Sequence, residues 1–527
     1  MNIDYLIKDG FIIDGAEKDS TPVKTDIAIE GDRIRETGNL SHLNATTVIN
    51  ATGLCVCPGF IDVHSHSEFS LLADGRAEGK ICQGITTEIN GNCGLSAAPL
   101  YGSALERREK DLEAFDIKER WNTFSEYFSF LEKKRFATNF ITLVGHGNLR
   151  ASVIGYEDRA LSENESNEMK SLLREAMNEG ARGLSTGLIY PPGIYSDTQE
   201  IIKLAREIKK YNGIYATHMR SEGDMLIEAV DEVISVAHNS GIHAQISHLK
   251  TSGEKNWKKL EDVFNTINSA HKAGISLTCD RYPYIAAGTD LDAILPSWAF
   301  EGGHEKELER LKSAKIQGEL RREILHAHPE EDYWDKVTIS SVISDKNKWM
   351  EGKSLSEISR SLNKQTVNCL FDILMEERLN VGAIFFSMNE ENLEAILKQP
   401  YTMIGSDSSA RSFDGITAKG MPHPRGFGSF PRVLGRYVRE ERTLTLSEAV
   451  HKMTGLPAKI FSIKQRGVIA KGYFADITIF DPEKVNGTAG FNNPFKKPEG
   501  IHHVLVNGVP VVFEGAITKA LPGRILR

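Results

Sequence analysis

The sequence predicts an α/β fold, a (β/α)8 barrel of the TIM type, with a small β domain built from both chain ends. The central part of the chain alternates strand-like apolar runs with amphipathic helical patterns, as in parallel strands connected by helices. Both ends instead contain only short apolar runs separated by turn residues. The length of 527 residues also suggests a large domain with accessory parts rather than one small core.

The two chain ends are expected to share one sheet. Near the C-terminus, Asn507-Gly508 separates two apolar runs, which is a strong signal of a β-hairpin. Neither end alone offers enough strands for a stable sheet. We therefore predict that residues 1–57 and 465–527 form one discontinuous small β domain beside a barrel domain of residues 58–464.

Eight strand-like runs account for the predicted barrel. They are Phe60–His66, Ile85–Ile89, Phe140–Gly145, Ala181–Leu188, Ile214–Met219, His243–Leu249, Ile275–Tyr282 and Tyr401–Asp407. Helical patterns lie between them; in residues 162–179, for example, apolar residues share one face and Gly180 stands where a helix ends. The gap before the last run is far longer than a βα unit needs. It predicts an inserted subdomain at about residues 290–395, polar and helical, which we call the insert.

Composition excludes several classes of function. The formal net charge of −9 is spread along the chain without a basic block, which argues against nucleic acids and anionic membranes as partners. The N-terminus lacks the features of a signal peptide, and no apolar run reaches the roughly 18 residues that could span a membrane. The six cysteines are scattered, as in a reducing compartment. We predict a cytoplasmic protein; the oligomeric state stays open, and a monomer is compatible with the sequence.

Candidate metal ligands occur where the predicted strands end, which is where barrels place their active sites. His64 and His66 end the first strand, and the two-residue period of a strand points both imidazoles to one face. Four further candidates end or follow later strands: Cys93 after the second, His218 at the fifth, His248 at the sixth and Asp407 at the eighth.

Each candidate also has an ordinary structural explanation. Cys93 alone is more often a small buried apolar residue, His218 a core histidine, and Asp407 a helix N-cap. His146, at the end of the third strand, is equally compatible with the core and with the site. Six candidates that all fall at predicted strand ends nevertheless favour one shared metal centre.

Zinc is the ion that suits a mixed set of imidazole and thiolate ligands. Its usual catalytic effect is to lower the pKa of a bound water to about 7 and to polarise a carbonyl group. A neighbouring carboxylate can accept the proton of the water and deliver it to a leaving nitrogen, and Asp407 is the candidate for this general base and acid. The predicted chemistry is hydrolysis of a carbonyl compound, with an amide as the leading choice.

The same residues carry a resemblance to a known family. The His-x-His after Pro-Gly-Phe-Ile-Asp, the single histidines of the fifth and sixth strands and the aspartate of the eighth resemble the amidohydrolase superfamily. More narrowly, the chain is similar to the D-aminoacylases, the N-acyl-D-amino-acid deacylases. The segments that carry this similarity are Gly91–Ser96, Gly183–Gly193, Tyr215–Arg220, Ser247–Lys250, Tyr282–Tyr284, Met421–Gly426 and Ser429–Gly435.

The resemblance implies roles for individual residues. It implies a tight zinc site of Cys93, His218 and His248, with the cysteine where many relatives use a lysine carbamate or a glutamate. It also implies a second, weaker metal position lined by His64, His66 and Asp407, and a small-molecule N-acyl-amino-acid substrate held by Tyr190, Lys250, Tyr282 and Arg425. An ammonium and a guanidinium are suited to binding an α-carboxylate. The implied reaction releases a carboxylate and a free D-amino acid.

Two departures from the family pattern concern specificity. After Tyr-Pro-Tyr the family often continues Thr-Ala-Gly-Ser, whereas here residues 285–289 read Ile-Ala-Ala-Gly-Thr. A hydroxyl contact to the substrate is therefore either missing or supplied by Thr289. The segment that follows Asp407, residues 408–419, is also longer than usual. The preferred side chain and acyl group stay open.

Two other functions remain as alternatives. A cyclic-amide hydrolase of the dihydroorotase or hydantoinase kind commonly carries a bridging lysine on the fourth strand, and residues 181–188 contain none. A catalytically silent barrel that serves as an interaction protein usually loses metal ligands, and here the full set is present. Both arguments favour the deacylase.

Overall fold

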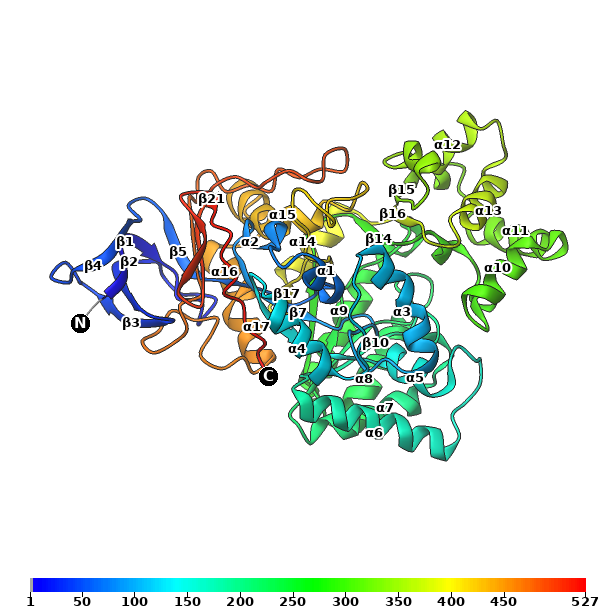
Figure 1. The fold of residues 1–527 in the computed structure, drawn as a ribbon, viewed down its shortest axis with the longest axis horizontal. Helices are drawn as coiled ribbons and strands as arrows, with labels where there is room; N and C mark the ends of the chain where they lie inside the picture. The colour runs from blue at the N-terminus through cyan, green and yellow to red at the C-terminus, as the bar shows by residue number, and fades with distance from the viewer. Residues whose placement is uncertain (1–2) are drawn as a thin grey trace.

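Strands from the two ends of the chain lie in one nine-stranded sheet (Figure 1). The computed structural model describes residues 3–527. The sheet has the order β21-β20-β19-β18-β5-β1-β2-β3, and β4 pairs with β1. Its strands are β1 (Ile3–Ile12), β2 (Val23–Glu30), β3 (Arg33–Gly38), β4 (Ala45–Asn50), β5 (Cys55–Pro58), β18 (Ile477–Phe480), β19 (Ile501–Val506), β20 (Val509–Phe513) and β21 (Ala516–Ile517). The two ends join where Cys57 of β5 lies opposite Thr478 of β18 in antiparallel register.

The hairpin predicted at Asn507-Gly508 is confirmed. The two residues connect β19 to β20 and have φ angles of 50° and 77°, so both lie in the left-handed region that a tight two-residue turn requires. Beyond β21 the chain leaves the sheet. The backbone N–H of Phe140 donates to Arg524 O at 2.8 Å, so the C-terminal residues also contact a central strand.

The central strands are parallel and occur in two runs, β6-β7-β8 and β9-β10-β11-β12-β13-β17. They are β6 (Phe60–Asp62), β7 (Ile85–Asn90), β8 (Asn139–Thr142), β9 (Val144–Gly145), β10 (Gly183–Gly187), β11 (Ile214–His218), β12 (Ala244–Ile246), β13 (Leu277–Arg281) and β17 (Thr402–Ile404). Only Leu143 separates β8 from β9. The segments beyond β6 and β17 meet through a parallel bridge between Ser65 and Ser408 and a 2.8 Å bond from Asp407 N to His64 O. Each of the eight predicted runs overlaps at least one of these strands, and the run 140–145 overlaps both β8 and β9.

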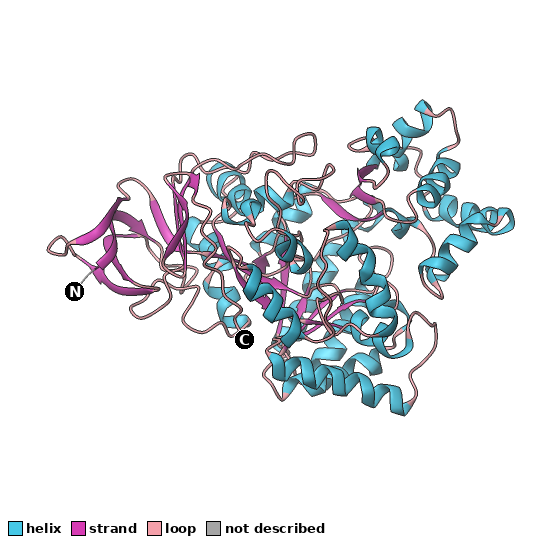
Figure 2. Ribbon diagram, viewed as in Figure 1, coloured by secondary structure: helices cyan, strands magenta, loops and turns pink. Residues whose placement is uncertain are grey.

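Helices cover the outer side of the parallel strands (Figure 2). They are α1 (Glu68–Ala73), α2 (Glu78–Ile81), α3 (Gly102–Ala114), α4 (Phe124–Lys134), α5 (His146–Ile154), α6 (Glu163–Glu179), α7 (Thr198–Lys209), α8 (Leu226–Ser240), α9 (Leu260–Lys272), α14 (Glu390–Lys398), α15 (Arg425–Arg432), α16 (Leu446–Met453) and α17 (Gly455–Ile460). The predicted helix at 162–179 begins with a capping box of Ser162 and Glu165 and ends at Gly180.

The insert, predicted as polar and helical, contains helices and in addition β-strands and an apolar cluster. It contains an antiparallel sheet of β14 (Ala286–Asp290), β16 (Gly382–Phe386) and β15 (Val337–Ser341), together with α10 (His304–Lys312), α11 (Ala314–Ala327), α12 (Leu355–Ser361) and α13 (Thr366–Glu376). An apolar cluster of its own runs from Leu291 to Ala383. These strands were not predicted, because each has only five residues and lies among longer helical patterns. In Figure 1 the insert projects to one side of the parallel strands.

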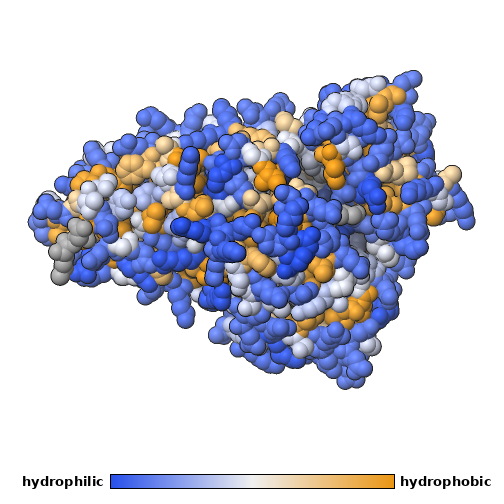
Figure 3. Space-filling model, viewed as in Figure 1, coloured by the Kyte–Doolittle hydropathy of each residue, from blue (hydrophilic) through white to orange (hydrophobic). Residues whose placement is uncertain are grey.

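Among residues 3–527, no helix is both long and apolar enough to cross a bilayer. Figure 3 shows hydrophilic side chains over most of the visible face, with apolar ones in small scattered groups.

Candidate metal centre

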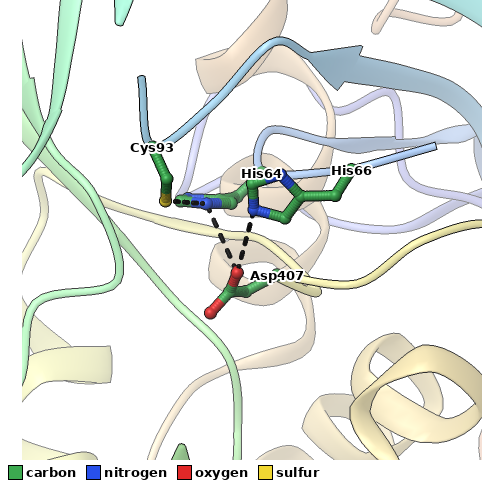
Figure 4. Close-up of side chains that lie close together, drawn as sticks. All are labelled: His64, His66, Cys93 and Asp407. Carbon is green, nitrogen blue, oxygen red and sulfur yellow. Dashed lines mark hydrogen bonds and ion pairs between the residues drawn. The ribbon is translucent and has the colours of Figure 1, made fainter. Parts of the chain in front are cut away.

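The six candidate ligands predicted from the sequence lie together. They form two groups that share one thiol: His64, His66, Cys93 and Asp407, and Cys93, His218 and His248. Within each group the potential ligand atoms lie within 4.8 Å of one another. Figure 4 shows Asp407 facing both histidines of the first strand, with Cys93 beside His64.

The backbone turns sharply at three of these positions. Cys93, His248 and Asp407 have φ angles of 53°, 39° and 50°, in the left-handed region that residues other than glycine seldom adopt. Each of them stands just beyond a parallel strand. Such conformations persist where the surrounding structure enforces them, and they concentrate at functional sites.

Cys93 is held as a thiolate. Its Sγ lies 3.3 Å from His64 Nε2 and 3.5 Å from His248 Nε2. Burial alone would raise the pKa of Cys93, but the charge of His64 and the proximity of His218 and His248 outweigh burial and hold that pKa well below its usual value. The thiolate is the form of cysteine that binds metals.

His218 supplies the clearest test of whether these residues fit a metal. Its Nε2 is buried and has no hydrogen-bond partner among the described residues. Burial also lowers the pKa of His218, so its imidazole is neutral. A neutral imidazole with a buried, unpaired nitrogen beside a thiolate needs a partner, and this donor chemistry fits zinc.

Asp407 faces the same space as a carboxylate. Its Oδ1 lies 3.4 Å from His64 Nε2 and 3.2 Å from His66 Nε2. Its Oδ2 forms an ion pair with Arg425 Nη1 at 2.7 Å. Burial would raise the pKa of Asp407, but the charges of Arg425 and the histidines hold it well below the usual range. The group is therefore ionised and able to accept a proton.

Two cations expected to bind substrate lie beside this centre. Lys250 Nζ lies 2.7 Å from His248 Nδ1 and 6.0 Å from the ring centre of Tyr282. The Arg425 guanidinium lies 4.8 Å from the same ring centre. The Tyr282 hydroxyl is buried and has no hydrogen-bond partner among the described residues, which leaves it available to a ligand.

Strand β14 borders the site on another side. The Tyr190 hydroxyl lies 3.1 Å from Thr289 Oγ1, and Arg425 Nη2 donates to Gly288 O at 3.2 Å. His423 fixes Arg425 in place, because its Nδ1 accepts from the Arg425 backbone N–H at 3.0 Å and its Nε2 lies 2.9 Å from the carbonyl of the first β14 residue. The Pro-His-Pro-Arg motif therefore positions its arginine through its histidine.

Comparison with known proteins agrees with this geometry. The family model described as "Amidohydrolase family" matches residues 47–289 and 317–512. D-aminoacylase from Alcaligenes xylosoxydans xylosoxydans is 36% identical over 524 residues, which cover 99% of this chain and 97% of that protein. The chain belongs to the D-aminoacylase family of amidohydrolases. The resemblance drawn from the sequence motifs is thereby confirmed.

Solved structures of this amidohydrolase family share the fold. N-acyl-D-glutamate deacylase from Bordetella bronchiseptica, solved with zinc and a phosphonate inhibitor that mimics the tetrahedral intermediate, is 32% identical with a TM-score of 0.84. A D-aminoacylase described with a binuclear metal centre, one-metal activation and second-metal attenuation is 33% identical with a TM-score of 0.83. Both alignments cover 100% of this chain and 100% of the other. The predicted α/β fold is therefore confirmed.

Two carboxylates of this amidohydrolase that contact the candidate ligands were not predicted from the sequence. Asp280 lies 3.2 Å from His64 Nδ1 and accepts from the His248 backbone N–H at 3.0 Å. A carboxylate on Nδ1 fixes the imidazole tautomer that presents Nε2 to a metal. Asp280 stands two residues before Tyr282, so strand alternation could have placed it on the same face.

The second missed carboxylate is Glu222. Its Oε1 lies 3.0 Å from His248 Nδ1 and 2.5 Å from Lys250 Nζ, and its Oε2 lies 3.6 Å from His218 Nε2. Burial would raise the pKa of Glu222, but the neighbouring His218 and His248 imidazoles and the Lys250 ammonium hold it well below its usual value. It stands in an irregular segment between β11 and α8, where no periodic pattern marks it.

His146 does not join the site. Its Nε2 lies 2.7 Å from Glu200 Oε1, and Arg150 Nη1 lies 2.5 Å from the other oxygen of that carboxylate. Of the two interpretations of His146, the structure favours a buried structural histidine.

Proposed function

We propose that this chain hydrolyses the amide bond of N-acyl-D-amino acids to a carboxylate and a free D-amino acid. The observation that carries the proposal is the arrangement of the buried Cys93 thiolate and its histidines opposite the ionised Asp407, with Lys250 and Arg425 beside them. The comparisons support it, since relatives that span the whole chain carry D-aminoacylase and N-acyl-D-glutamate deacylase names.

The residues divide into three roles. Cys93, His218 and His248 would hold one zinc ion tightly, and His64, His66 and Asp407 would line a second, weaker position. When bound, zinc supplies an acidified water and polarises the substrate carbonyl. Asp407 accepts a proton at a carboxylate oxygen and returns it to the leaving nitrogen, which then departs as an amine.

The substrate is held by its carboxylate and by the surrounding hydroxyls. Lys250 and Arg425 carry the charges that an α-carboxylate requires. In the resting site both are already paired, Lys250 with Glu222 and Arg425 with Asp407. A substrate carboxylate therefore has to share or replace these contacts. The hydroxyls of Tyr190 and Tyr282 complete the binding set.

The architecture that supports this function is also part of the proposal. The parallel strands would close as a (β/α)8 barrel within residues 58–464, since strand β6 and strand β17 are joined beyond their ends. Residues 1–57 and 465–527 would form the discontinuous β domain, with the insert at 290–395 between the seventh and eighth strands. All six cysteines are free and buried, which suits a cytoplasmic enzyme.

The decisive experiment compares paired N-acetyl-D- and N-acetyl-L-amino acids with acidic and apolar side chains. Amine release is measured before and after zinc removal by a chelator, and after zinc is restored. We expect turnover of D substrates that is lost with zinc and recovered with it. The matched variant Asp407→Asn should retain zinc and lose turnover by about 100-fold or more.

Three outcomes would contradict the proposal. Turnover of cyclic amides but not of linear ones would support the alternative function, a hydantoinase-like cyclic-amide hydrolase. Preferential turnover of L substrates would refute the assigned handedness. Full activity of a zinc-loaded Asp407→Asn variant would refute the role of Asp407 as base and acid.

A further inference from the structure

A third cluster of metal-compatible side chains lies in the insert, apart from the metal centre. Asp292 follows β14, and His304 and Glu307 stand on the first turn of α10. One potential ligand atom from each residue lies within 4.8 Å of those of the other two. His304 and Glu307 are three residues apart on a helix, so their side chains emerge on the same face.

The two carboxylates are buried. Asp292 is 8% exposed and Glu307 is 1% exposed. Oε1 of Glu307 has no hydrogen-bond partner among the described residues. A buried carboxylate oxygen without a donor is costly, because desolvation is not compensated by any hydrogen bond.

The surrounding charges do not neutralise the cluster. Among the described side chains, no lysine or arginine forms an ion pair with Asp290, Asp292 or Glu307. Burial and the neighbouring carboxylates raise the pKa of Asp292 to about 7 and that of Glu307 to about 9, while Arg107 opposes the effect only partly. The described basic side chains therefore do not compensate for ionisation of the cluster, whereas a bound cation would.

We propose that Asp292, His304 and Glu307 bind a divalent transition-metal ion at the base of the insert. Two carboxylate oxygens and an imidazole nitrogen, without a thiolate, suit a harder ion than the Cys93 centre does, and Mn²⁺ matches this donor set. The unpartnered Oε1 of Glu307 would gain its missing partner from the ion.

The position of this site gives the ion a structural consequence. Asp292 stands just after β14, whose Gly288 accepts a hydrogen bond from Arg425 and whose Thr289 contacts Tyr190. An ion that joins Asp292 to α10 ties the end of β14 to the first long helix of the insert. It thereby fixes one wall of the candidate active site without contacting the substrate.

The test uses the full chain with its thiolate centre loaded with zinc and Mn²⁺ as the probe. Free Mn²⁺ is measured by electron paramagnetic resonance during a titration of the wild type, Glu307→Gln, Asp292→Asn and the matched control Glu309→Gln. Glu309 lies on the same helix and is exposed, paired only with Lys306. We expect Glu307→Gln and Asp292→Asn to lose one Mn²⁺ equivalent, with binding at least about tenfold weaker, and Glu309→Gln to bind like the wild type.

Thermal unfolding with and without Mn²⁺ provides a second readout that does not depend on catalysis. We expect Mn²⁺ to raise the Tm of the wild type and of Glu309→Gln more than that of Glu307→Gln. Metal-free Glu307→Gln should fold, because it replaces a buried ionisable group with a neutral one and keeps the side-chain shape. Equal Mn²⁺ binding in all four proteins would overturn the proposal. So would a higher Tm of Glu307→Gln together with no Mn²⁺ response of the wild type, because protons would then satisfy the cluster.

This site is independent of the proposed reaction. The two can fail separately, because neither the Mn²⁺ titration nor the thermal unfolding measures turnover.

Discussion

Replacing Asp280 by asparagine should remove one buried negative charge and little else. Oδ1 of Asp280 receives hydrogen bonds from His64 Nδ1 at 3.2 Å and from the His248 backbone N–H at 3.0 Å. Its Oδ2 accepts from Gln245 Nε2 at 2.7 Å, and Gln245 Oε1 has no partner of its own among the described residues. If the Gln245 amide turns over, its oxygen accepts from the new asparagine amide. Asp280→Asn can therefore keep every hydrogen bond while losing the charge.

The magnitude follows from the two bonds that hold metal ligands. A hydrogen bond to a charged acceptor contributes about 1.5–3 kcal/mol and a neutral one about 0.5–1.5 kcal/mol. The bond to His64 should therefore weaken by about 1–1.5 kcal/mol, roughly a tenfold change in an equilibrium constant. The bond to the His248 main chain adds up to a similar amount. We expect zinc affinity and kcat/KM to fall about 10- to 100-fold, the range typical of carboxylates that orient ligating histidines.

Competition with a chromophoric chelator measures the zinc affinity, and thermal unfolding verifies the fold. Asp26→Asn is the matched control, because Asp26 is also buried and accepts from the backbone N–H groups of Asp9 and Leu40, far along the chain from the ligands. This control should lose stability and keep its zinc affinity. A folded Asp280→Asn protein with unchanged zinc affinity would refute the reasoning.

Two further predictions concern another orienting carboxylate and a buried histidine. Glu222→Gln removes the charge beside His248 Nδ1 and Lys250, so zinc affinity should fall about tenfold. The control Glu228→Gln, at an exposed position, should leave zinc affinity unchanged. Equal zinc affinities of the two variants would show that Glu222 does not orient His248. Burial and a neighbouring histidine lower the pKa of His503 to about 4 in the folded protein. Between about pH 6.5 and 4, this histidine therefore binds a proton in the unfolded chain but not in the folded one, and the free energy of unfolding decreases as the pH falls. Urea unfolding should show a loss of about 2–3 kcal/mol by pH 4 that His503→Gln lacks, and identical pH profiles would refute it.

The sequence could predict features that depend on period and spacing. The alternation of a strand placed His64 and His66 on one face, and the rule that barrel sites gather at strand ends brought Cys93 and Asp407 to them. The Asn507 turn likewise follows from residue types alone. These features are local or repeat at every strand, so no knowledge of packing is needed to find them.

Other features depend on how segments distant in the sequence pack together, and no sequence pattern indicates them. Glu222 stands in a turn, and only the folded chain shows that its carboxylate reaches both His248 and Lys250. The left-handed backbone at Cys93 is equally hidden, because a cysteine gives no turn signal as a glycine would. The insert sheet was missed for a related reason: β14 pairs with β16, about a hundred residues further along the chain.

Strand β14 connects the departure from the family motif to the geometry of the site. The hydroxyl expected after Tyr-Pro-Tyr is displaced along the chain to Thr289, and in the structure it contacts the Tyr190 hydroxyl at 3.1 Å. Gly288, one residue earlier, accepts from Arg425 Nη2 at 3.2 Å, so the same strand also contacts this arginine. In this chain the threonine hydroxyl therefore contacts Tyr190, a tyrosine that already borders the candidate zinc ligands. Substrate selectivity should therefore depend on the position of β14. A contact that holds Asp292, just beyond the C-terminal end of β14, would fix that position.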